Sequence, residues 1–314
     1  MNNNLTFTSS LFLDFTLSFL FTLPLKVVAM NSQPTFSFEL FPPRTPEAAA
    51  KLPGVISQLA EVQPRYFSIT HGAGGSDQNG TYDTLMAVVD HCGIEAVPHL
   101  TCVGSTRGNI GATLDRYREA GVKRIVALRG DLPATAMSAS APGEFHYANE
   151  LVRFIRETHG SWFTIEVAAY PEVHPQAPSS DSDFENFCRK VEAGADGALT
   201  QLFYNVEAYF HFVERCEKAG IRIPIVPGIM PITNYASTVR FCNGCGADLP
   251  RWVRLRLEDL QYDKPALIEF GLNVVSRLCE SLLRGGAPGL HFYTINQAEP
   301  TLRLWERVVA TAIT

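Results

Sequence analysis

The sequence predicts a (β/α)8 barrel, built as a single domain with extra helices before its last strand. Three observations predict this fold. Short apolar segments alternate with helical ones, Gly often ends a helical segment just before an apolar one, and polar residues follow the apolar segments. For example, a helical pattern stops at Gly121, RIVAL (124–128) forms a buried strand, and Arg129, Gly130 and Asp131 follow it. Eight such units in 314 residues match a closed barrel.

The expected strands are short runs rich in apolar and β-branched residues. They lie at 37–41, 66–70, 95–100, 124–128, 163–168, 197–203, 223–227 and 291–295. Helices are expected at 46–61, 147–158 and 183–193. Three more are expected to end at residue 92, after a Gly-rich loop (71–80), at residue 120 and at residue 219. Others are expected to begin near residues 235 and 299, with further helices within 249–284. Pro46 suits the first turn of the first helix. The stretch 249–284 is longer than one barrel helix requires, so it accounts for the extra helices.

The composition describes a globular protein without a basic surface. Hydrophobic residues make up 46% of the chain and charged residues 18%, which is enough apolar material for a sizeable core. The net charge of -6 and the pI near 5.8 give no electrostatic basis for binding nucleic acid. We therefore expect neither DNA nor RNA as a partner.

The seven cysteines favour reduced thiols and a cytoplasmic protein. Their number is odd, and a chain of this size needs no disulfides for stability. Cys242 and Cys245 form one CxxC pair, but no second Cys or His pair lies close by, as a structural zinc site requires. The simpler interpretation is that they are two small residues on a helix.

Residues 1–35 do not match the rest of the chain and are expected to be an extension that is disordered or not native. Residues 1–30 are apolar and rich in Phe, Leu and Thr, like a signal peptide. However, no Lys or Arg precedes the apolar run, Asp14 interrupts it, and no small-residue cleavage pattern follows. The run is also short for a membrane-spanning helix. Met30 directly precedes NSQPTFSFELFPPR, so we expect it to be the native start and the catalytic barrel to occupy 36–314.

Polar residues gather where the expected strands end. They are Glu39, Thr70, His71, His99, Arg129, Asp131, Tyr170, His174, Gln201, Gly228 and Asn296. Each alone has an ordinary structural explanation, such as a solvated carboxylate or a hydrogen-bonded histidine. Because the C-terminal ends of barrel strands meet at one rim, their convergence predicts an active site there.

Several common site types are missing from the sequence. His99 and His174 have no obvious third ligand, so no metal site is expected. The chain has no GxSxG elbow, no GxxxxGK[ST] loop and no GxGxxG after a strand. A nucleotide or phosphate ligand would therefore be held by the barrel rim, where Arg129, Arg189 and Lys190 supply positive charge.

Eight motifs in order resemble those of a known family. They are SFELFPPR, ITHGAGG, PHLTC, ALRGDLP, EVAAYPEVHP, TQLFYNVEAY, PGIMPITNY and HFYTINQAE, within residues 36–309. With them the chain resembles the methylenetetrahydrofolate reductase family, flavin enzymes that supply methyltetrahydrofolate for methionine synthesis. Each motif alone is modest, but eight in this order are highly specific. The resemblance implies a (β/α)8 barrel that binds FAD.

The resemblance also assigns roles to the matching positions. The implied FAD contacts are Thr70, His99, Arg129, Gly130, Asp131, Tyr147, Ala148, Tyr170, His174, Asp183, Asn186, Arg189 and Lys190. The implied substrate contacts are Glu39, Asp131, Gln201, Ser237, Phe241 and Gln297. Phe241 is implied to stack on the bound folate or nicotinamide. Ser237 and Gln297 stand where bacterial relatives carry Gln and Arg, and losing the Arg is expected to weaken binding of the folate's glutamate tail.

The implied reaction reduces 5,10-methylenetetrahydrofolate to 5-methyltetrahydrofolate with hydride from NADH or NADPH, passed through FAD. The hydride chemistry belongs to the cofactor, and the protein positions the reacting rings. Opening of the folate's five-membered ring needs a proton on the departing nitrogen, and Glu39, in an apolar FEL/FPP setting, is implied to be the general acid. Asp131, as an anion, would stabilise the developing cation of the substrate. We also expect a homo-oligomer without a membrane partner.

Two alternatives from other classes stay open. One is another FAD-dependent barrel oxidoreductase, such as a proline-dehydrogenase-like enzyme, and the PHLTC, RGDLP and YPEVHP motifs argue against it. The other is a non-catalytic protein tethered to a membrane by residues 1–30. Substrate turnover distinguishes the first alternative, and colourless protein that pellets with membranes would support the second.

Deletion of residues 1–29 is predicted to leave folding and activity unchanged, because the expected barrel begins at Phe36. The check compares solubility, flavin absorbance and turnover between the full and shortened chains. A shortened chain that is insoluble or loses its flavin would contradict this prediction.

Overall fold

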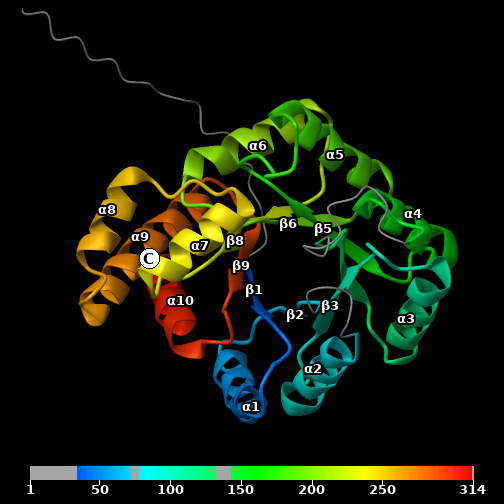
Figure 1. The fold of residues 1–314 in the computed structure, drawn as a ribbon, viewed down its shortest axis with the longest axis horizontal. Helices are drawn as coiled ribbons and strands as arrows, with labels where there is room; N and C mark the ends of the chain where they lie inside the picture. The colour runs from blue at the N-terminus through cyan, green and yellow to red at the C-terminus, as the bar shows by residue number, and fades with distance from the viewer. Residues whose placement is uncertain (1–33, 72–77, 132–142, 313–314) are drawn as a thin grey trace, which may run out of the picture.

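The computed structural model describes residues 34–71, 78–131 and 143–312, in which helices surround a central ring of strands (Figure 1). The strands are β1 (Thr35–Leu40), β2 (Phe67–Ile69), β3 (Ala96–Thr101), β4 (Arg124–Leu128), β5 (Thr164–Ala169), β6 (Gly197–Thr200), β7 (Ile225–Val226), β8 (Gly228–Ile229) and β9 (Gly289–Tyr293). The helices are α1 (Pro46–Ala60), α2 (Gln78–Cys92), α3 (Arg107–Glu119), α4 (Ala148–His159), α5 (Ser180–Glu192), α6 (Val206–Lys218), α7 (Tyr235–Cys245), α8 (Arg251–Asp259), α9 (Lys264–Arg284) and α10 (Ala298–Ala312).

The strands pair in parallel, and the two ends of the sheet meet at Pro227. The hydrogen-bonded order is β7-β6-β5-β4-β3-β2-β1-β9-β8. β7 and β8 are the two halves of one segment, and Pro227 between them has no N–H to donate to a ladder. β7 pairs with β6, and β8 pairs with β9 on the other side. The strands therefore occupy eight positions, which confirms the predicted (β/α)8 barrel, and α8 and α9 confirm the extra helical segment before the last strand.

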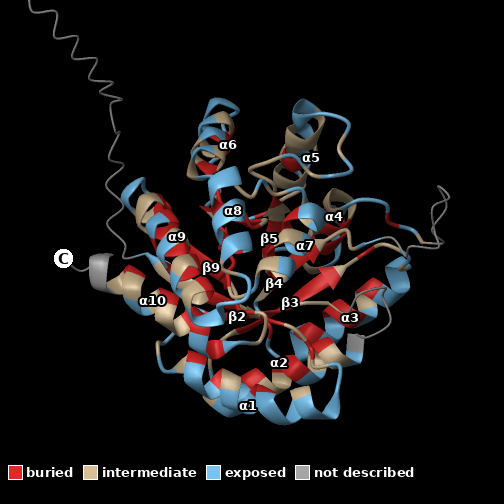
Figure 2. Ribbon diagram, turned by 60° about the vertical axis from the view of Figure 1, so that its left-hand side comes forward, coloured by how far each residue is buried: buried red, intermediate tan, exposed pale blue. Residues whose placement is uncertain are grey.

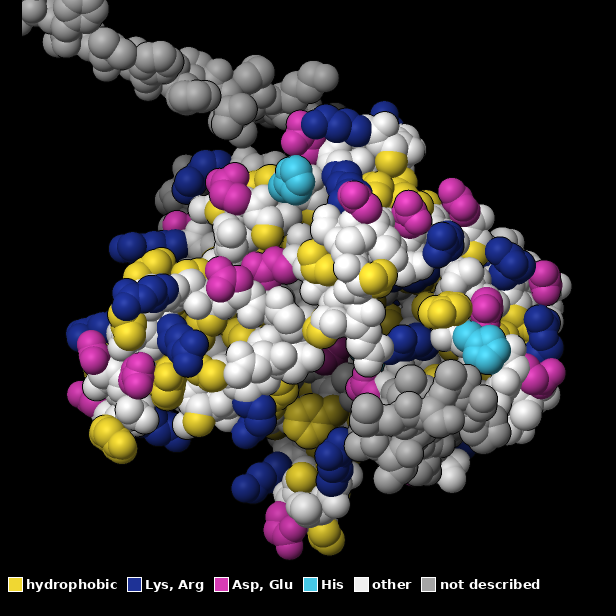
Figure 3. All heavy atoms as spheres, turned by 45° about the horizontal axis from the view of Figure 1, so that its top comes forward, with side chains coloured by type: hydrophobic (Ala, Val, Ile, Leu, Met, Phe, Trp, Pro, Cys, Tyr) yellow, Lys and Arg dark blue, Asp and Glu magenta, His cyan; other side chains and the backbone are white. Residues whose placement is uncertain are grey.

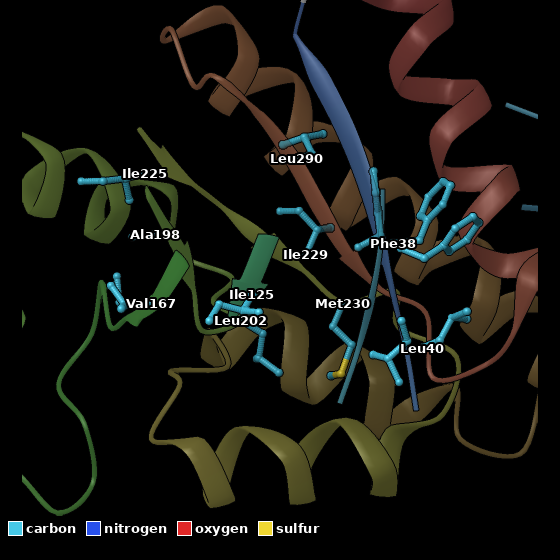
Figure 4. Packing of buried hydrophobic residues seen from close by; sticks show 14 of the residues in the cluster. Phe38, Leu40, Ile125, Val167, Ala198, Leu202, Ile225, Ile229, Met230 and Leu290 are labelled. Carbon is cyan, nitrogen blue, oxygen red and sulfur yellow. The ribbon is translucent and has the colours of Figure 1, made fainter. Parts of the chain in front are cut away.

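Alternation along the strands separates two hydrophobic clusters. Phe38 and Leu40 of β1 belong to the large core between the strands and the helices, where the Phe38 ring lies 6.0 Å from the ring of Phe67 and 5.7 Å from that of Phe292 (Figure 4). Figure 2 shows buried positions on the strands and on the helix sides that face them. The smaller cluster consists of Tyr66, Val97, Leu128, Val126, Leu199 and Val226. Because successive strand residues point to opposite faces, this smaller cluster fills the inside of the barrel.

Polar caps and glycines set the ends of the helices. Thr45 Oγ1 accepts a hydrogen bond from the amide of Ala48 at 3.2 Å, and Ser179 Oγ accepts one from the amide of Ser182 at 3.1 Å. Among the glycines with positive φ, five follow helices at the stops that the sequence predicted. They are Gly93, Gly121, Gly194, Gly220 and Gly286.

Several element boundaries differ from the predicted ones, and three of the differences have a clear physical reason. β1 begins at Thr35, whose amide donates to the Pro288 carbonyl at 3.2 Å. α5 begins at Ser180 rather than at residue 183, because Ser179 caps it. β6 ends at Thr200 rather than at residue 203, although residues 202 and 203 are buried, so apolar character extended the prediction beyond the ladder.

The extension before residue 34 lies outside the described residues. Within the described ranges, no helix combines the length and apolar character needed to cross a membrane. Cys242 and Cys245 lie on α7, as the simpler interpretation of the CxxC pair predicted.

Gly271→Ala is predicted to destabilise the protein, although Ala favours helices. Gly271 is buried in α9, and a Cβ there would lie 2.4 Å from the carbonyl oxygen of Ile232. Overpacking of this kind typically costs about 1–3 kcal/mol. The matched control is Gly111→Ala in α3, where a Cβ would meet nothing within 4 Å, and Ala there should stabilise by about 0.5–1 kcal/mol. Equal shifts of the urea unfolding midpoint in both variants would show that the contact at Gly271 does not constrain the fold.

Candidate active site

A polar cluster inside the barrel surrounds Glu39. Its Oε2 atom lies 3.5 Å from His99 Nε2 and 4.0 Å from His291 Nε2. The Glu39 side chain is 20% exposed, whereas that of His291 is fully buried. Glu39 comes near the C-terminal end of β1, so its exposed part faces the rim where barrel active sites form. We call Ser37, Glu39, Ser68, His99 and His291 the interior cluster.

His291 is held through both of its ring nitrogens. Nδ1 lies 2.7 Å from Ser37 Oγ, and Nε2 lies 3.3 Å from Ser68 Oγ. Ser37 is the register partner of His291 between β1 and β9, and Ser68 is the register partner of Glu39 between β1 and β2. With His99 on β3, the interior cluster is built by four neighbouring strands, β9, β1, β2 and β3.

The chain segments that leave β1 and β9 are tied together beside Glu39. Thr294 Oγ1 donates to the Glu39 carbonyl at 2.6 Å. The Asn296 side chain accepts from the amide of Phe41 at 3.0 Å and donates to its carbonyl at 2.8 Å. Asn296 has a φ of 50°, a left-handed conformation in which Asn is enriched. These bonds fix the backbone that directly follows the Glu39 side chain.

His99 is neutral at physiological pH. Burial lowers its pKa to about 4, and the nearby Glu39 carboxylate only partly opposes this shift. The 3.5 Å approach between the two side chains is therefore not an ion pair at pH 7. His99 Nε2 is buried and has no hydrogen-bond partner among the described residues.

The apolar setting predicted for Glu39 is wrong. Phe38 and Leu40, its neighbours in the sequence, belong to the outer core. Glu39 points to the opposite side of β1, beside two histidines. The FEL motif places apolar residues next to Glu39 along the chain, but strand alternation separates them in space.

A second group of predicted residues meets on the rim beyond β4 and β5. We call Arg129, Tyr170, His174, Asp183 and Lys190 the rim cluster. The Tyr170 and His174 rings meet edge to face with centroids 4.6 Å apart. Asp183 Oδ2 accepts from the His174 amide at 3.0 Å, and Lys190 Nζ donates to a carbonyl near the end of β5.

The rim cluster brings two cations, Arg129 and Lys190, close to His174 and Asp183. Burial lowers the pKa of Lys190 to about 8, and Asp183 opposes the shift. Burial also lowers the pKa of His174, and Arg129 and Lys190 add to this effect while Asp183 opposes it. On the face shown in Figure 3, acidic and basic side chains are interspersed. Confined cations of this kind suit a small anionic ligand.

Other predicted cofactor contacts flank the rim cluster. Gly130 follows Arg129 with a φ of 86°, and Asp131 is exposed. Asp131 lies close enough to Tyr170 to add to the effect of burial, which raises the pKa of Tyr170 to about 12. Tyr147 is 57% exposed and immediately precedes Ala148, the first residue of α4.

The remaining predicted residues are not joined to either cluster by a described contact. The Thr70 amide donates to the end of β1 at 2.9 Å. Arg189 donates to Asn186 Oδ1 at 2.8 Å, on the side of α5 where Arg189 is exposed. Gln201 Oε1 accepts from the amide of the next residue at 2.9 Å. Ser237 lies in the first turn of α7, Phe241 is on the same helix and 38% exposed, and Gln297 is exposed just before α10.

Sequence reasoning missed four residues in or beside these clusters. Ser37, Ser68 and His291 belong to the interior cluster, and Gln176, beside the rim cluster, accepts from Arg129 Nη2 at 2.6 Å. Alternation gave a signal for Ser37, which shares the inward face of β1 with Glu39. No local pattern distinguishes His291 as a neighbour of Glu39, because their proximity depends on the pairing of the first strand with the last.

Comparison with known proteins identifies the family. The family model described as methylenetetrahydrofolate reductase matches residues 25–309. The chain belongs to the methylenetetrahydrofolate reductase family. It is 39% identical over 270 residues to 5,10-methylenetetrahydrofolate reductase of Salmonella typhimurium, which covers 86% of this chain and 89% of the relative. The Escherichia coli protein of the same name is 38% identical over the same length and coverage.

More distant relatives of this methylenetetrahydrofolate reductase family member extend the comparison. Methylenetetrahydrofolate reductase (NADH) 1 of Arabidopsis thaliana is 35% identical over 282 residues, which is 87% of this chain and 48% of the plant protein. A solved structure of an uncharacterized protein from Clostridium thermocellum matches with a TM-score of 0.63 at 14% identity, over 90% of this chain and 96% of that one. This likeness shows the fold alone. That protein binds two copies of 5-methyl-5,6,7,8-tetrahydrofolic acid.

His99→Gln is predicted to make folding less sensitive to acid. Because the folded pKa of His99 is about 4, below the ordinary value of about 6.5, the unfolded chain binds the proton more tightly. Wild-type stability should therefore be lost as pH falls from 6.5 to 4, by on the order of 3 kcal/mol from this residue. The measurement is the free energy of unfolding in urea at pH 7 and pH 4. The control is His91→Gln at an exposed position of α2, and an equal acid loss in wild type and His99→Gln would contradict the prediction.

Proposed function

We propose that this chain reduces 5,10-methylenetetrahydrofolate to 5-methyltetrahydrofolate, with hydride from NADH or NADPH delivered through bound FAD. One observation carries the proposal: the partly exposed carboxylate of Glu39 in the barrel mouth of a chain in the methylenetetrahydrofolate reductase family. The rim cluster supports the proposal, because its cations provide a second binding region on the rim beyond β4 and β5.

The rim cluster has the chemistry that an FAD site requires. Arg129 and Lys190 are cations suited to a diphosphate. Because desolvation lowers the pKa of Lys190 to about 8, an anion bound near it would offset part of that cost. The other proposed contacts are Thr70, His99, Gly130, Asp131, Tyr147, Ala148, Tyr170, His174, Asp183, Asn186 and Arg189. FAD, when bound, would accept hydride from the nicotinamide and donate it to the folate.

Glu39 is the proposed general acid. The five-membered ring of the folate opens when its departing nitrogen gains a proton, and a carboxylic acid in the mouth can deliver one. The Thr294 bond to the Glu39 carbonyl fixes the backbone at this point. On the inner side, neutral His99 and buried His291 limit where the carboxylate can lie.

Asp131 is the proposed anion beside the substrate. It is exposed at the exit of β4, and its charge reaches Tyr170 in the rim cluster. An anion there would stabilise the positive charge that develops when the folate ring opens. The acid and the anion lie on different strands, so each role has its own surroundings.

Gln201, Ser237, Phe241 and Gln297 are the proposed substrate contacts. Gln201 Oε1 is already bonded to a backbone amide, so its NH₂ group is the part that would bind the folate. Phe241 exposes its ring on α7 and suits stacking on a pterin or nicotinamide. Gln297 carries no charge, so its contact with a glutamate tail would be weaker than an Arg–carboxylate pair.

Family membership favours folate reduction over proline-dehydrogenase-like chemistry. The choice between NADH and NADPH, a homo-oligomeric state and a cytoplasmic location stay predictions. All seven cysteines are free thiols, which agrees with a reducing compartment. A membrane tether through residues 1–30 concerns a segment outside the described residues.

Glu39→Gln is predicted to separate the two half-reactions. Reduction of the flavin by NAD(P)H needs no proton on a departing nitrogen, whereas folate reduction does. Gln keeps the size and hydrogen bonding of Glu but cannot donate that proton, so folate reduction should slow by roughly a hundredfold or more. Stopped-flow absorbance measures flavin bleaching by NAD(P)H and then reoxidation by methylenetetrahydrofolate.

Glu119→Gln, at an exposed position of α3, is the matched control and should change neither phase. Equal slowing of both phases in Glu39→Gln would mean that Glu39 supports the structure of the site or its cofactor. The general-acid role would then have to be dropped.

A further inference from the structure

Two segments that carry different parts of the proposed site touch at Glu172. Glu172 lies between Tyr170 and His174, in the segment that joins β5 to α5. Its Oε2 atom accepts a hydrogen bond from the backbone amide of Asp248 at 2.9 Å. Asp248 comes just after α7, the helix that carries Ser237 and Phe241. The Glu172 carboxylate therefore links the segment that carries the rim residues Tyr170 and His174 to the end of α7, which carries the proposed substrate contacts.

A second, independent contact seats the end of α7 on the same segment. Gly246 ends α7 in the left-handed conformation with a φ of 77°. A Cβ on Gly246 would lie 3.0 Å from Pro175 Cγ and 3.1 Å from the Val173 carbonyl oxygen. The backbone thus packs against residues 173–175 as closely as a glycine allows. We call the Glu172–Asp248 hydrogen bond, together with this packing at Gly246, the clamp.

The clamp holds the C-terminal end of α7, and Phe241 lies one helical turn before that end. The amide of Ala247 donates to the Cys242 carbonyl at 3.0 Å, which carries the backbone from the helix into the clamp without a break. Motion at Asp248 would therefore be transmitted to the turn that bears Phe241. The Phe241 ring is partly exposed, and the described contacts near it, such as Arg240 with its guanidinium carbon 5.7 Å from the ring centroid, come from α7 itself.

We propose that Glu172 is a positioning residue, which fixes α7 against the rim cluster so that Phe241 and Ser237 stand at a set place over the bound substrate. The proposal rests on the proposed function, since it assigns a purpose to the placement of those two side chains. Glu172 does not act on the substrate itself, because its carboxylate is engaged with the Asp248 amide.

Burial raises the pKa of Glu172, and the nearby charge of Asp248 adds to this shift. The hydrogen bond from the Asp248 amide opposes the shift, because it stabilises the ionised carboxylate. A carboxylate that is partly out of water loses hydration, and an amide donor compensates best when the carboxylate is charged. Gln at this position keeps a carbonyl oxygen for the Asp248 amide, whereas Ala removes the acceptor.

The test compares Glu172→Ala, Glu172→Gln and Asp248→Ala in the full chain with its flavin. Glu172→Ala is expected to raise the KM for methylenetetrahydrofolate roughly tenfold, as the loss of one charge-assisted hydrogen bond suggests, and to leave kcat unchanged. Such a split means that binding was lost in ground state and transition state alike. Glu172→Gln should restore most of the affinity. Asp248→Ala keeps the donating amide and removes a like charge near Glu172, so it should bind the folate at least as tightly as wild type.

Three outcomes would overturn the proposal. One is an unchanged KM in Glu172→Ala, and another is a loss of bound flavin or thermal stability that Glu172→Gln does not restore, which would indicate a structural role. The third is a loss in Asp248→Ala equal to that in Glu172→Ala, because the side chain and not the amide would then matter.

Hydrogen exchange at the Asp248 amide tests the clamp without relying on turnover. Exchange should be faster in Glu172→Ala than in wild type, and Asp248→Ala should keep the slow rate. If wild-type protein does not reduce methylenetetrahydrofolate but these exchange rates differ as expected, the proposed function fails and the clamp stands as a contact. If wild-type protein is active and the exchange rates are equal, the clamp fails alone.

Discussion

Strand alternation in a closed barrel is the constraint on which the rest of this structure depends. On β1, Phe38 and Leu40 enter the outer core while Ser37 and Glu39 point inward. A slip of β1 by one residue would exchange the two sets, burying the carboxylate among helices and filling the mouth with Phe38. Pairing with β2 and β9 fixes this register, so the same hydrogen bonds that close the barrel also place its proposed acid.

The two clusters divide the proposed chemistry between inside and rim. In the interior cluster, burial keeps His99 uncharged beside the carboxylate of Glu39. The rim cluster instead concentrates Arg129 and Lys190, whose charges suit an anionic cofactor. Side-chain hydrogen bonds join the segments that follow the strands near both clusters. Asn296 binds the backbone beside Glu39, and Glu172 binds a backbone amide beside the rim cluster. Reacting groups held on a rigid scaffold in this way lose little freedom when substrates bind.

The sequence predicted the order of the elements well, because each depends on local signals such as a Gly stop, a polar cap or a short apolar run. It missed the break at Pro227 and the early end of β6, since a ladder ends where its partner ends and apolar character does not mark that point. Glu39 and His99 were each recognised, but their contact was not. Ser37 and His291 are 254 residues apart in the chain, and their contact becomes visible only when the barrel closes. Glu172 was missed for the same reason, because its partner is a backbone amide on another loop.

The proposed function requires that a flavin held by this barrel passes electrons from a nicotinamide to a folate. Anaerobic visible spectra of the purified wild-type protein measure this transfer. The oxidised flavin bands should bleach when NADH or NADPH is added and return when 5,10-methylenetetrahydrofolate follows. A protein that binds no flavin, or a bleached flavin that the folate does not reoxidise, would contradict it.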